Sequence, residues 1–504
     1  MALLPYLGTL RNAFVWDDLQ HIAHNPHIAS VSDAAVYLHR LEGTYFRPLV
    51  FFSYSLERFV WGLAPSGFHL TNLLLHALVT VLVVVVAIRS GTASRAALVA
   101  GAVFALHPAQ TEAVAYISGR TDLLMTAAAL LAWWAVLGSG GALWRGLLAG
   151  TAAGVAILSK ESGFAVVLFL AWLAYRKETE WRPRFALAGP AVASAALLLA
   201  ARPGGVPWPT APFHFAIWII GVARTIETYV SLLVWPSTLM VDRLTPLSAS
   251  TLAAAAALAI VAGAVVASAW GLSKRGSIGD WTAWTLAFYL PVANLLPLYP
   301  AIAQRAVFTP EHNLYAPIAG LAALSGIAID RLLNQLPRYG RLALAASGSL
   351  VLAVWGIQTA SRTLQWRDEA MLFRSAAVAG SISPRVWYNL GNVLMQRGDA
   401  GSAVIALRRA SELAPSDAEV WTNLAVALQS RGLLDAAQQA YQRAEELSPA
   451  NALLLENMGT LYLARGDLEA ARRAFARSLA LDPQRAKSRA AIQAIDQRSG
   501  DPPP

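Results

Sequence analysis

The sequence contains no cysteine and is short of charged residues. Without cysteine the chain has no disulfide, no thiolate nucleophile and no cysteine-based metal site. Charged residues make up 14% of the chain, whereas a soluble globular protein carries roughly 25%. Because 56% of the residues are hydrophobic, this composition is typical of a membrane protein.

A secretory signal peptide is also not expected. Residues 1–10 carry no basic residue and are too short to cross a bilayer, which takes about 20 apolar residues. We interpret this start as the remnant of a lost first span. Residues 1–71 are then predicted to form a first extracytoplasmic loop with short helices.

Ten apolar runs follow this loop, and their Ala, Leu and Val content suits helices packed on helices. They predict an all-α fold, a polytopic membrane helix bundle over residues 72–360. The runs are 72–88, 96–111, 121–137, 143–158, 162–175, 185–200, 251–272, 281–297, 315–330 and 342–358.

Charge between the runs indicates the orientation of the bundle. Alternate loops carry 12 Lys or Arg against 4 Asp or Glu, and the other loops before residue 384 carry 13 of each sign. Because cytoplasmic loops collect Lys and Arg, the loop with Asp17 and Asp18 is predicted to lie outside the cytoplasm. The net charge of +9 then reflects orientation, and no nucleic-acid partner is expected. The basic loops are residues 89–95, the loop with Arg145, 176–184, 274–280 and 330–341.

Residues 213–235 are apolar enough to span but contain Arg224 and Glu227. If they crossed the membrane, the charge difference downstream would reverse. We therefore predict an interfacial or re-entrant helix on the outer face. On it, Arg224 and Glu227 are spaced to neutralise each other.

The last 120 residues or so change character, because Pro415, Pro449 and Pro483 stand 34 residues apart. Small and large residues recur in register with them, such as Ala403, Ala437 and Ala471. This pattern resembles the tetratricopeptide repeat, a two-helix unit that stacks into an α-solenoid. It predicts three repeats over 384–485, a linker over 361–383, and a capping helix and tail over 486–504.

Asp17 and Asp18 are the strongest candidates for chemistry in the first loop. One carboxylate could take a proton from an acceptor hydroxyl while the other positions a cation or a donor. The alternative is a helix N-cap with a solvated acid.

Further isolated charges fall on loops of the same predicted side. Glu112 and Arg120 follow His107 in one motif; Arg120 could hold a phosphate or could snorkel at the interface. Lys160 and Glu161 lie between two apolar runs, where charges tend to be functional or paired, although a plain turn is also open. Arg305 and His312 share a later loop, and a lone His is more often structural than a ligand. No dense metal cluster is expected.

Three asparagines recur at the sixth position of the repeats: Asn389, Asn423 and Asn457. Side-chain amides on the concave face could hold an extended peptide by its backbone. They could equally be ordinary polar residues of a groove.

Several motifs together carry a family resemblance. They are Phe14 to Asp18, Asn25 to Ile28, Tyr45 to Leu49 with Arg47, His69 to His76, His107 to Leu124, and Ser159 to Glu161. With the repeats, they make the chain resemble the transmembrane and tetratricopeptide repeat-containing proteins and their bacterial relatives. The resemblance implies a C-type glycosyltransferase with a polyprenyl-phosphate-linked sugar as donor, and an acid of the first outer loop as the base.

These observations lead to one functional hypothesis. The chain is expected to be an inverting, multi-pass glycosyltransferase of the bacterial cytoplasmic membrane that moves a mannose-like sugar to a protein or glycan hydroxyl. Asp17 or Asp18 would be the base. Arg120, Lys160 or Arg305 would hold the donor phosphate, with supporting roles for Arg47, His107, Glu112, Glu161 and His312. No tightly bound cofactor is expected, and the need for a divalent metal stays open.

The alternatives come from other functional classes. A non-catalytic membrane anchor for a repeat scaffold would tolerate neutralisation of the outer charges but not of the asparagines. A lipid-sugar translocase would need polar residues along a path through the membrane, whereas the charges here cluster at the ends of spans.

Overall fold

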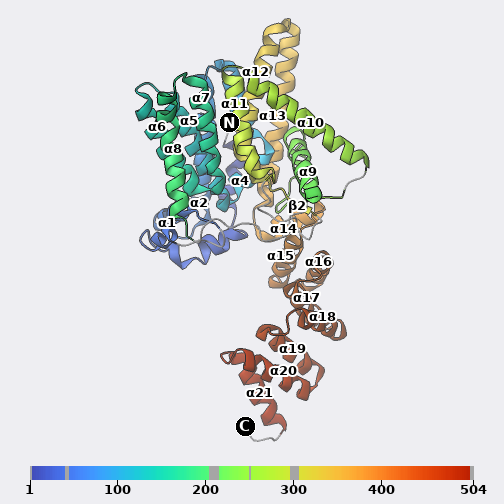
Figure 1. Ribbon diagram of the computed structural model, residues 1–504. Coiled ribbons are helices and arrows are strands. Elements are labelled where there is room, and N and C mark those ends of the chain that lie inside the picture. The colour runs from blue at the N-terminus through green and yellow to red at the C-terminus, as the bar shows by residue number, and fades with distance from the viewer. Residues whose placement is uncertain (1–2, 40–44, 204–214, 249–250, 296–305, 500–504) are drawn as a thin grey trace. The chain divides into compact units, whose positions relative to one another are not determined.

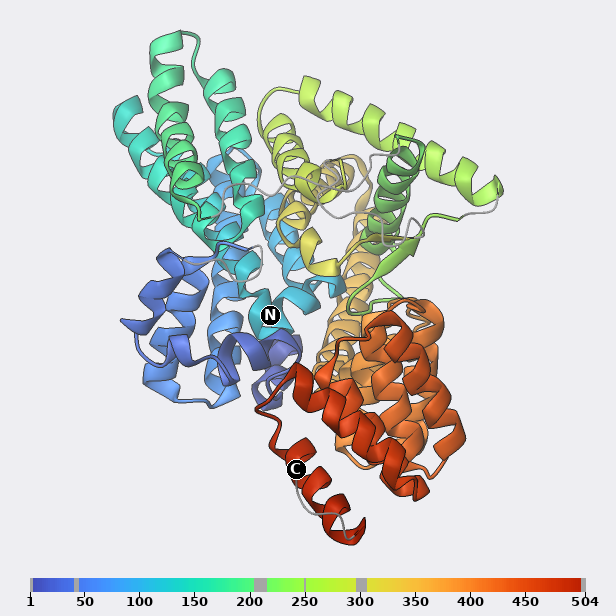
Figure 2. The same cartoon turned by 60° about the horizontal axis from the view of Figure 1, so that its bottom comes forward.

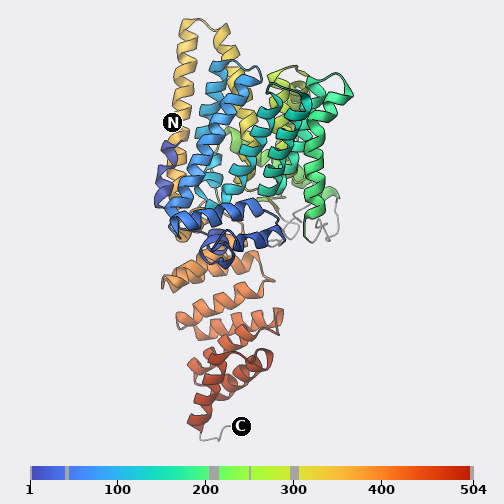
Figure 3. The same ribbon diagram turned by 90° about the vertical axis from the view of Figure 1, so that its left-hand side faces the viewer.

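The computed structural model describes residues 3–39, 45–203, 215–248, 251–295 and 306–499, and the chain divides into two units, Met1–Met371 and Leu372–Pro504. As predicted, the fold is all-α. In the first unit long helices stand side by side; the segments between Asp17 and Trp61 gather at one end of them, whereas Leu4–Arg11 lies along α2 and α13 (Figures 1 and 3). The helices of this unit are α1 (Pro48–Trp61), α2 (Pro65–Arg89), α3 (Ser94–Leu106), α4 (Thr111–Ala115), α5 (Arg120–Val136), α6 (Ala142–Ser159), α7 (Ala165–Lys177), α8 (Trp181–Ala201), α9 (Phe215–Val234), α10 (Thr251–Ser273), α11 (Ser277–Tyr289), α12 (Tyr315–Gln335) and α13 (Arg338–Gln365).

Each of the ten predicted apolar runs overlaps one of these helices. Within the described residues, six helical segments are long and apolar enough to cross a membrane, which supports a multi-pass membrane protein. They are Pro65–Arg89, Ala142–Ser159, Trp181–Ala201, Ile217–Val234, Glu311–Gln335 and Arg338–Gln365. The number of actual crossings stays a prediction.

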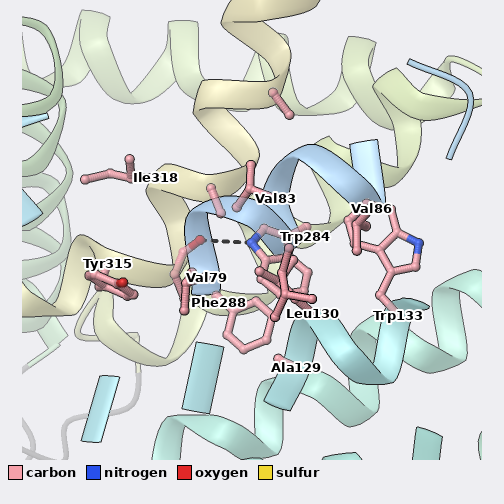
Figure 4. Packing of buried hydrophobic residues seen from close by; sticks show 14 of the residues in the cluster. Val79, Val83, Val86, Ala129, Leu130, Trp133, Trp284, Phe288, Tyr315 and Ile318 are labelled. Carbon is pink, nitrogen blue, oxygen red and sulfur yellow. Dashed lines mark hydrogen bonds between the residues drawn. The ribbon is translucent and has the colours of Figure 1, made fainter. Parts of the chain in front are cut away.

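Small residues let the helices approach closely, as lipid-embedded helices require. A Cβ on Gly146 of α6 would lie 1.9 Å from the carbonyl oxygen of Ala186 in α8. Elsewhere, buried aromatic rings pack between the helices. Trp133 of α5 packs edge-on against Trp281 of α11 at 4.3 Å between ring centroids. The Trp284 indole N–H donates to the carbonyl of Ala316 at 2.9 Å, and Figure 4 shows Trp133 and Trp284 among the other buried side chains of this core.

Several of the basic loops predicted to share one side of the membrane contact one another. Arg95 pairs with Asp330 at 2.6 Å, and Arg145 pairs with Glu178 at 3.2 Å. The Arg176 guanidinium donates to the Lys274 carbonyl at 2.7 Å. Each contact joins two of the basic loops. The contacts form two groups, 89–95 with 330–341 and the Arg145 loop with 176–184 and 274–280, and the assignment of these loops to the cytoplasm stays a prediction.

Helix α9 contacts residues of the other set along its length. The Trp218 indole N–H donates to the Leu295 carbonyl at 3.0 Å, and the Tyr229 hydroxyl donates to the Pro310 carbonyl at 3.2 Å. It also lies against a short antiparallel ribbon of β1 (Leu244–Pro246) and β2 (Ala306–Phe308), which the sequence did not predict (Figure 2). The interfacial assignment of α9 stays a prediction, because its length would also allow a span.

In the second unit, three pairs of helices and one further helix follow one another. Gly398, Gly432 and Gly466 have positive φ of 78°, 73° and 78° at the turn inside each pair. This is the left-handed region, which glycine enters without a steric penalty. The segment predicted as a linker is largely helical, since α13 continues to Gln365 and α14 (Glu369–Val378) follows. The helices of the second unit are α15 (Pro384–Gln396), α16 (Ala400–Leu413), α17 (Ala418–Ser430), α18 (Leu434–Leu447), α19 (Ala452–Arg465), α20 (Leu468–Leu481) and α21 (Ala486–Ser499).

Candidate functional site

The two adjacent acids occupy different environments. Asp18 is fully buried and accepts hydrogen bonds from the backbone N–H of Ser118 at 2.8 Å and from its hydroxyl at 2.6 Å. Its second oxygen accepts from the backbone N–H of Val15 at 3.3 Å. Asp17 is only half-buried. Asp18 therefore fastens the first loop to the segment around Ser118, while Asp17 remains reachable.

The residue before the pair has an unusual backbone. Trp16 has φ of +55°, a left-handed conformation that costs a bulky residue on the order of 1–3 kcal/mol and clusters at functional sites. Its ring stacks on Tyr116 at 5.9 Å, and Tyr116 stacks on Trp366 at 5.3 Å. This aromatic stack stabilises the strained turn and so fixes the direction in which the Asp17 side chain points.

Burial changes the acidity of this group of residues. It raises the pKa of Asp18 to about 7, against the hydrogen bonds from Ser118, which favour the charged form. It also raises the pKa of Tyr116, and the charges of Asp17 and Asp18 add to that increase. The tyrosine hydroxyl therefore stays protonated beside the acid pair.

Arg120, which the sequence suggested for the donor phosphate, is surrounded by protein partners. Its guanidinium is fully buried and bonds to Glu57 at 2.6 Å and to Asn72 at 2.8 Å. Further bonds go to Ser53 at 3.2 Å and to the Phe68 carbonyl at 2.9 Å. Because its N–H groups donate to residues of α1 and α2, Arg120 holds these two helices against the start of α5. This geometry argues against a contact with phosphate.

Lys160 and Glu161 lie among partners on neighbouring elements. The Lys160 ammonium donates to Asp122 at 2.6 Å and lies 3.5 Å from the side-chain oxygen of Asn313. Glu161 pairs with Arg47 at 2.7 Å and accepts from the backbone N–H of Phe46 at 3.0 Å. Burial acts to raise the pKa of Glu161, but the Arg47 guanidinium outweighs it and holds the pKa below its ordinary range. Two cations and two carboxylates thus meet near the start of α5.

His107 is structural in this geometry. One ring nitrogen accepts from the backbone N–H of Ala109 at 3.2 Å, and the other lies 3.1 Å from the Leu233 carbonyl. The ring is buried against Trp355 at 4.6 Å between centroids. This side chain ties the motif around residue 107 to α9, which leaves it no free group for a substrate.

Glu112 and His312 are brought together. The Glu112 carboxylate accepts from the backbone N–H of Glu311 at 2.9 Å and of His312 at 3.2 Å. A ring nitrogen of His312 lies 3.0 Å from its other oxygen. Glu112 therefore caps the turn that carries His312, whose side chain is 26% exposed. Of these two, only His312 faces outward.

Two arginines that the sequence reasoning missed join this cluster. Arg243 pairs with Glu311 at 3.2 Å, and Arg362 approaches the other oxygen of Glu311 at 3.7 Å. Both arginines are buried. Arg362 lies near the end of a predicted span, where a charged residue is costly and tends to be paired. That position could have identified Arg362 as a candidate from the sequence.

Arg305 lies outside the described residues. Within the described ranges, no group of three or more His, Asp and Glu side chains is arranged to hold a metal ion.

The three repeat asparagines differ from one another. The Asn423 amide donates to the Tyr388 hydroxyl at 3.0 Å and to Asn392 at 2.9 Å, across two repeats. For Asn389 and Asn457, the described residues provide no side-chain hydrogen bond. The predicted ladder is therefore uneven, because the middle amide already joins two repeats.

Known proteins match both parts of the chain. The family model of the tetratricopeptide repeat matches residues 384–427, 418–451 and 452–485. Protein O-mannosyl-transferase Tmtc1 of Drosophila melanogaster is 27% identical over 83% of this chain and 61% of its own length. The chain is similar to the Tmtc proteins. Human TMTC1 is 25% identical over 82% of this chain and 54% of its own length.

The chain thus spans between 54% and 61% of the length of these two Tmtc relatives. Tmtc2 of Drosophila melanogaster is 39% identical over 24% of this chain and 14% of its own length. Among solved structures, MamA is 21% identical with a TM-score of 0.25, covering 26% of this chain and 77% of MamA. The structure of YrrB is 24% identical with a TM-score of 0.25, covering 35% of this chain and 89% of YrrB.

Proposed function

We propose that this chain is a membrane glycosyltransferase with Asp17 as its catalytic base. One observation carries the proposal: Asp17 follows a strained Trp16 and stays half-buried, while its neighbour Asp18 is buried and committed to Ser118. A general base must reach the proton that it removes. Of the two acids, Asp17 meets that condition and Asp18 acts as a positioning residue.

The reaction is a single displacement. Asp17 takes the proton of an acceptor hydroxyl as the hydroxyl oxygen attacks the anomeric carbon of the sugar. The bond from that carbon to the donor phosphate breaks on the opposite side, so the configuration inverts. A fixed carboxylate on a strained turn suits this step, because a base placed in advance loses little freedom in the transition state.

Charge must also develop on the leaving phosphate. Lys160 and Arg47 are the described cations closest to this role, since they meet Asp122 and Glu161 near the start of α5. The Arg47 side chain is 20% exposed, and a guanidinium can hold a phosphate through two hydrogen bonds. If the donor phosphate replaced Glu161 as the partner of Arg47, the guanidinium would remain paired when the donor binds.

The substrates follow from the resemblance to the Tmtc relatives, which are named protein O-mannosyl-transferases. The donor would be a mannose-like sugar on a polyprenyl phosphate, and the acceptor a Ser or Thr hydroxyl of a protein. The repeats would recruit that protein, with Asn389 and Asn457 meeting its backbone. The active side would be the extracytoplasmic face of a bacterial cytoplasmic membrane, because cytoplasmic loops collect Lys and Arg and the acid pair lies on a loop of the other set.

A transfer assay tests this proposal. Purified protein in lipid nanodiscs is given polyprenyl-phosphate mannose and peptides rich in Ser and Thr, and mass spectrometry counts added hexose. The wild type should transfer, and Asp17→Asn should not, at an unchanged melting temperature. Asp33→Asn, an exposed acid of the same loop, serves as the matched control. Equal transfer by wild type and Asp17→Asn would contradict the mechanism.

A further inference from the structure

A largely apolar cavity of about 260 Å³ opens between α10, α11 and α12. It belongs to none of the groups described above. Its walls include Ala267 and Gly271 of α10, Ile278 of α11, and Leu324 and Ala328 of α12. The cavity therefore lies among three helices that are apolar enough to face lipid, and the three can be followed as neighbouring ribbons in Figure 2.

Two of the hydroxyl groups in its wall are satisfied within their own helix. The hydroxyls of Thr282 and Thr285 donate to carbonyls of their own helix, those of Ile278 and Trp281, at 2.8 and 2.9 Å. Their methyl groups are then left for the cavity. At Gly271, a Cβ would lie 2.4 Å from the Thr282 hydroxyl, so α10 and α11 touch at that level. The cavity suits a hydrocarbon chain, since a void of this kind offers a water molecule few partners.

Positive charge collects at one end of the cavity. Arg331 lines it, is exposed, and makes no ion pair with any residue of the described ranges. Lys274, whose ammonium lies 4.8 Å from the centroid of the Trp270 ring, and Arg275 follow directly after α10. An apolar slot with Arg331 in its wall and two further cations near α10 fits a phosphate ester attached to an acyl chain.

We propose that this cavity binds an anionic phospholipid, with an acyl chain between α10, α11 and α12 and the phosphate at Arg331. The lipid-linked sugar donor fits this place less well. Arg331 and Lys274 lie on two of the basic loops, 330–341 and 274–280, whereas Lys160 contacts Asn313, which directly precedes the other end of α12. The phospholipid therefore sits at the end of the bundle remote from the acid pair and binds whether or not the chain transfers sugar.

Native mass spectrometry tests the site. Delipidated protein in detergent is titrated with dioleoyl-phosphatidylglycerol, and separately with dioleoyl-phosphatidylcholine and with undecaprenyl phosphate. Three variants accompany the wild type: Arg331→Gln, Ala328→Trp, which fills the cavity, and Arg338→Gln, an exposed arginine outside it. Melting temperatures show that each variant is folded.

The proposal predicts tighter binding of phosphatidylglycerol than of phosphatidylcholine. Arg331→Gln removes one cation near the lipid phosphate and should therefore weaken the binding of phosphatidylglycerol about fivefold. Ala328→Trp should weaken the binding of both phospholipids, and Arg338→Gln should bind them as tightly as the wild type does. The proposal fails if Arg331→Gln binds phosphatidylglycerol as tightly as the wild type does. It also fails if undecaprenyl phosphate displaces phosphatidylglycerol and if Arg331→Gln and Ala328→Trp weaken the binding of undecaprenyl phosphate instead.

Discussion

The Asp18 carboxylate and Ser118 are joined twice, through the serine backbone N–H at 2.8 Å and through its hydroxyl at 2.6 Å. The two residues are 100 positions apart, so this pair of hydrogen bonds holds the first loop against the segment before α5. It is also what distinguishes two acids that are neighbours in the chain. Asp18 is committed to the fold, and Asp17 is left to act.

The first prediction concerns the pH dependence of stability. The pKa of Asp18 rises from 3.8 to about 7 on folding because the group is buried. Between these values the folded state holds a proton that the unfolded state has lost, so stability falls as pH rises through this window. The melting temperature of Asp18→Asn should lack this contribution and fall less between pH 4 and 7. Ser118→Ala loses a bond to the charged form, so its decline should extend above pH 7. Equal slopes for wild type and Asp18→Asn would refute this.

The second prediction concerns Arg120. Its bonds to Glu57, Asn72 and Phe68 need a planar fork, which lysine lacks. Arg120→Lys should therefore lower the free energy of unfolding by about 3–5 kcal/mol, read as a lower melting temperature, whereas the exposed Arg338→Lys should not. A folded Arg120→Lys with the wild-type melting temperature and a raised KM for the donor would restore the phosphate role that the sequence suggested.

The third prediction is a double-mutant cycle on Lys160 and Asp122. Lys160→Met leaves a buried carboxylate unpaired, which costs about 3–5 kcal/mol. Asp122→Asn in the same chain should recover much of that loss, because the two side chains lie 2.6 Å apart. The double variant then isolates the function of the lysine: it should be folded, with a higher KM for the donor. Additive losses of stability would show that the pair is not coupled.

The fourth prediction separates the repeat asparagines. Asn423→Ala removes hydrogen bonds to Tyr388 and Asn392, and each is worth about 1 kcal/mol. It should lower the melting temperature. Asn457→Ala should leave the melting temperature unchanged and raise the KM for a protein acceptor. The reverse pattern would mean that Asn423 contacts the acceptor and that the bonds across the repeats add little.

Several features of the fold could be predicted from the sequence because they depend on local patterns. Three prolines 34 residues apart located the repeats, and the apolar runs located the long helices. The extent of α2 could not be predicted in this way. It begins at Pro65, before the apolar run that starts at residue 72. Its first turns are fixed by tertiary contacts, such as the bond from Arg120 to the Phe68 carbonyl, which a hydropathy pattern does not reveal.

The site could be predicted only in part. Asp17 and Asp18 were both candidates, but only the bond between Asp18 and Ser118 tells them apart, and that bond depends on tertiary structure. Arg120 has the residue type that binds phosphate, yet its partners on two other helices decide its role. Arg243 was missed because a buried arginine looks no different in sequence from an exposed one.

The central claim is that Asp17 is the base, and the rate of hexose transfer to a peptide by acid-pair variants tests it most directly. The transfer rate is measured for wild type, Asp17→Asn and Asp18→Asn, each checked for folding. Loss of a general base should reduce kcat of Asp17→Asn by about 100-fold or more at an unchanged melting temperature. Asp18→Asn should lose less activity and change the pH dependence of stability. If Asp18→Asn abolishes transfer while folded and Asp17→Asn retains the wild-type rate, the assignment is wrong.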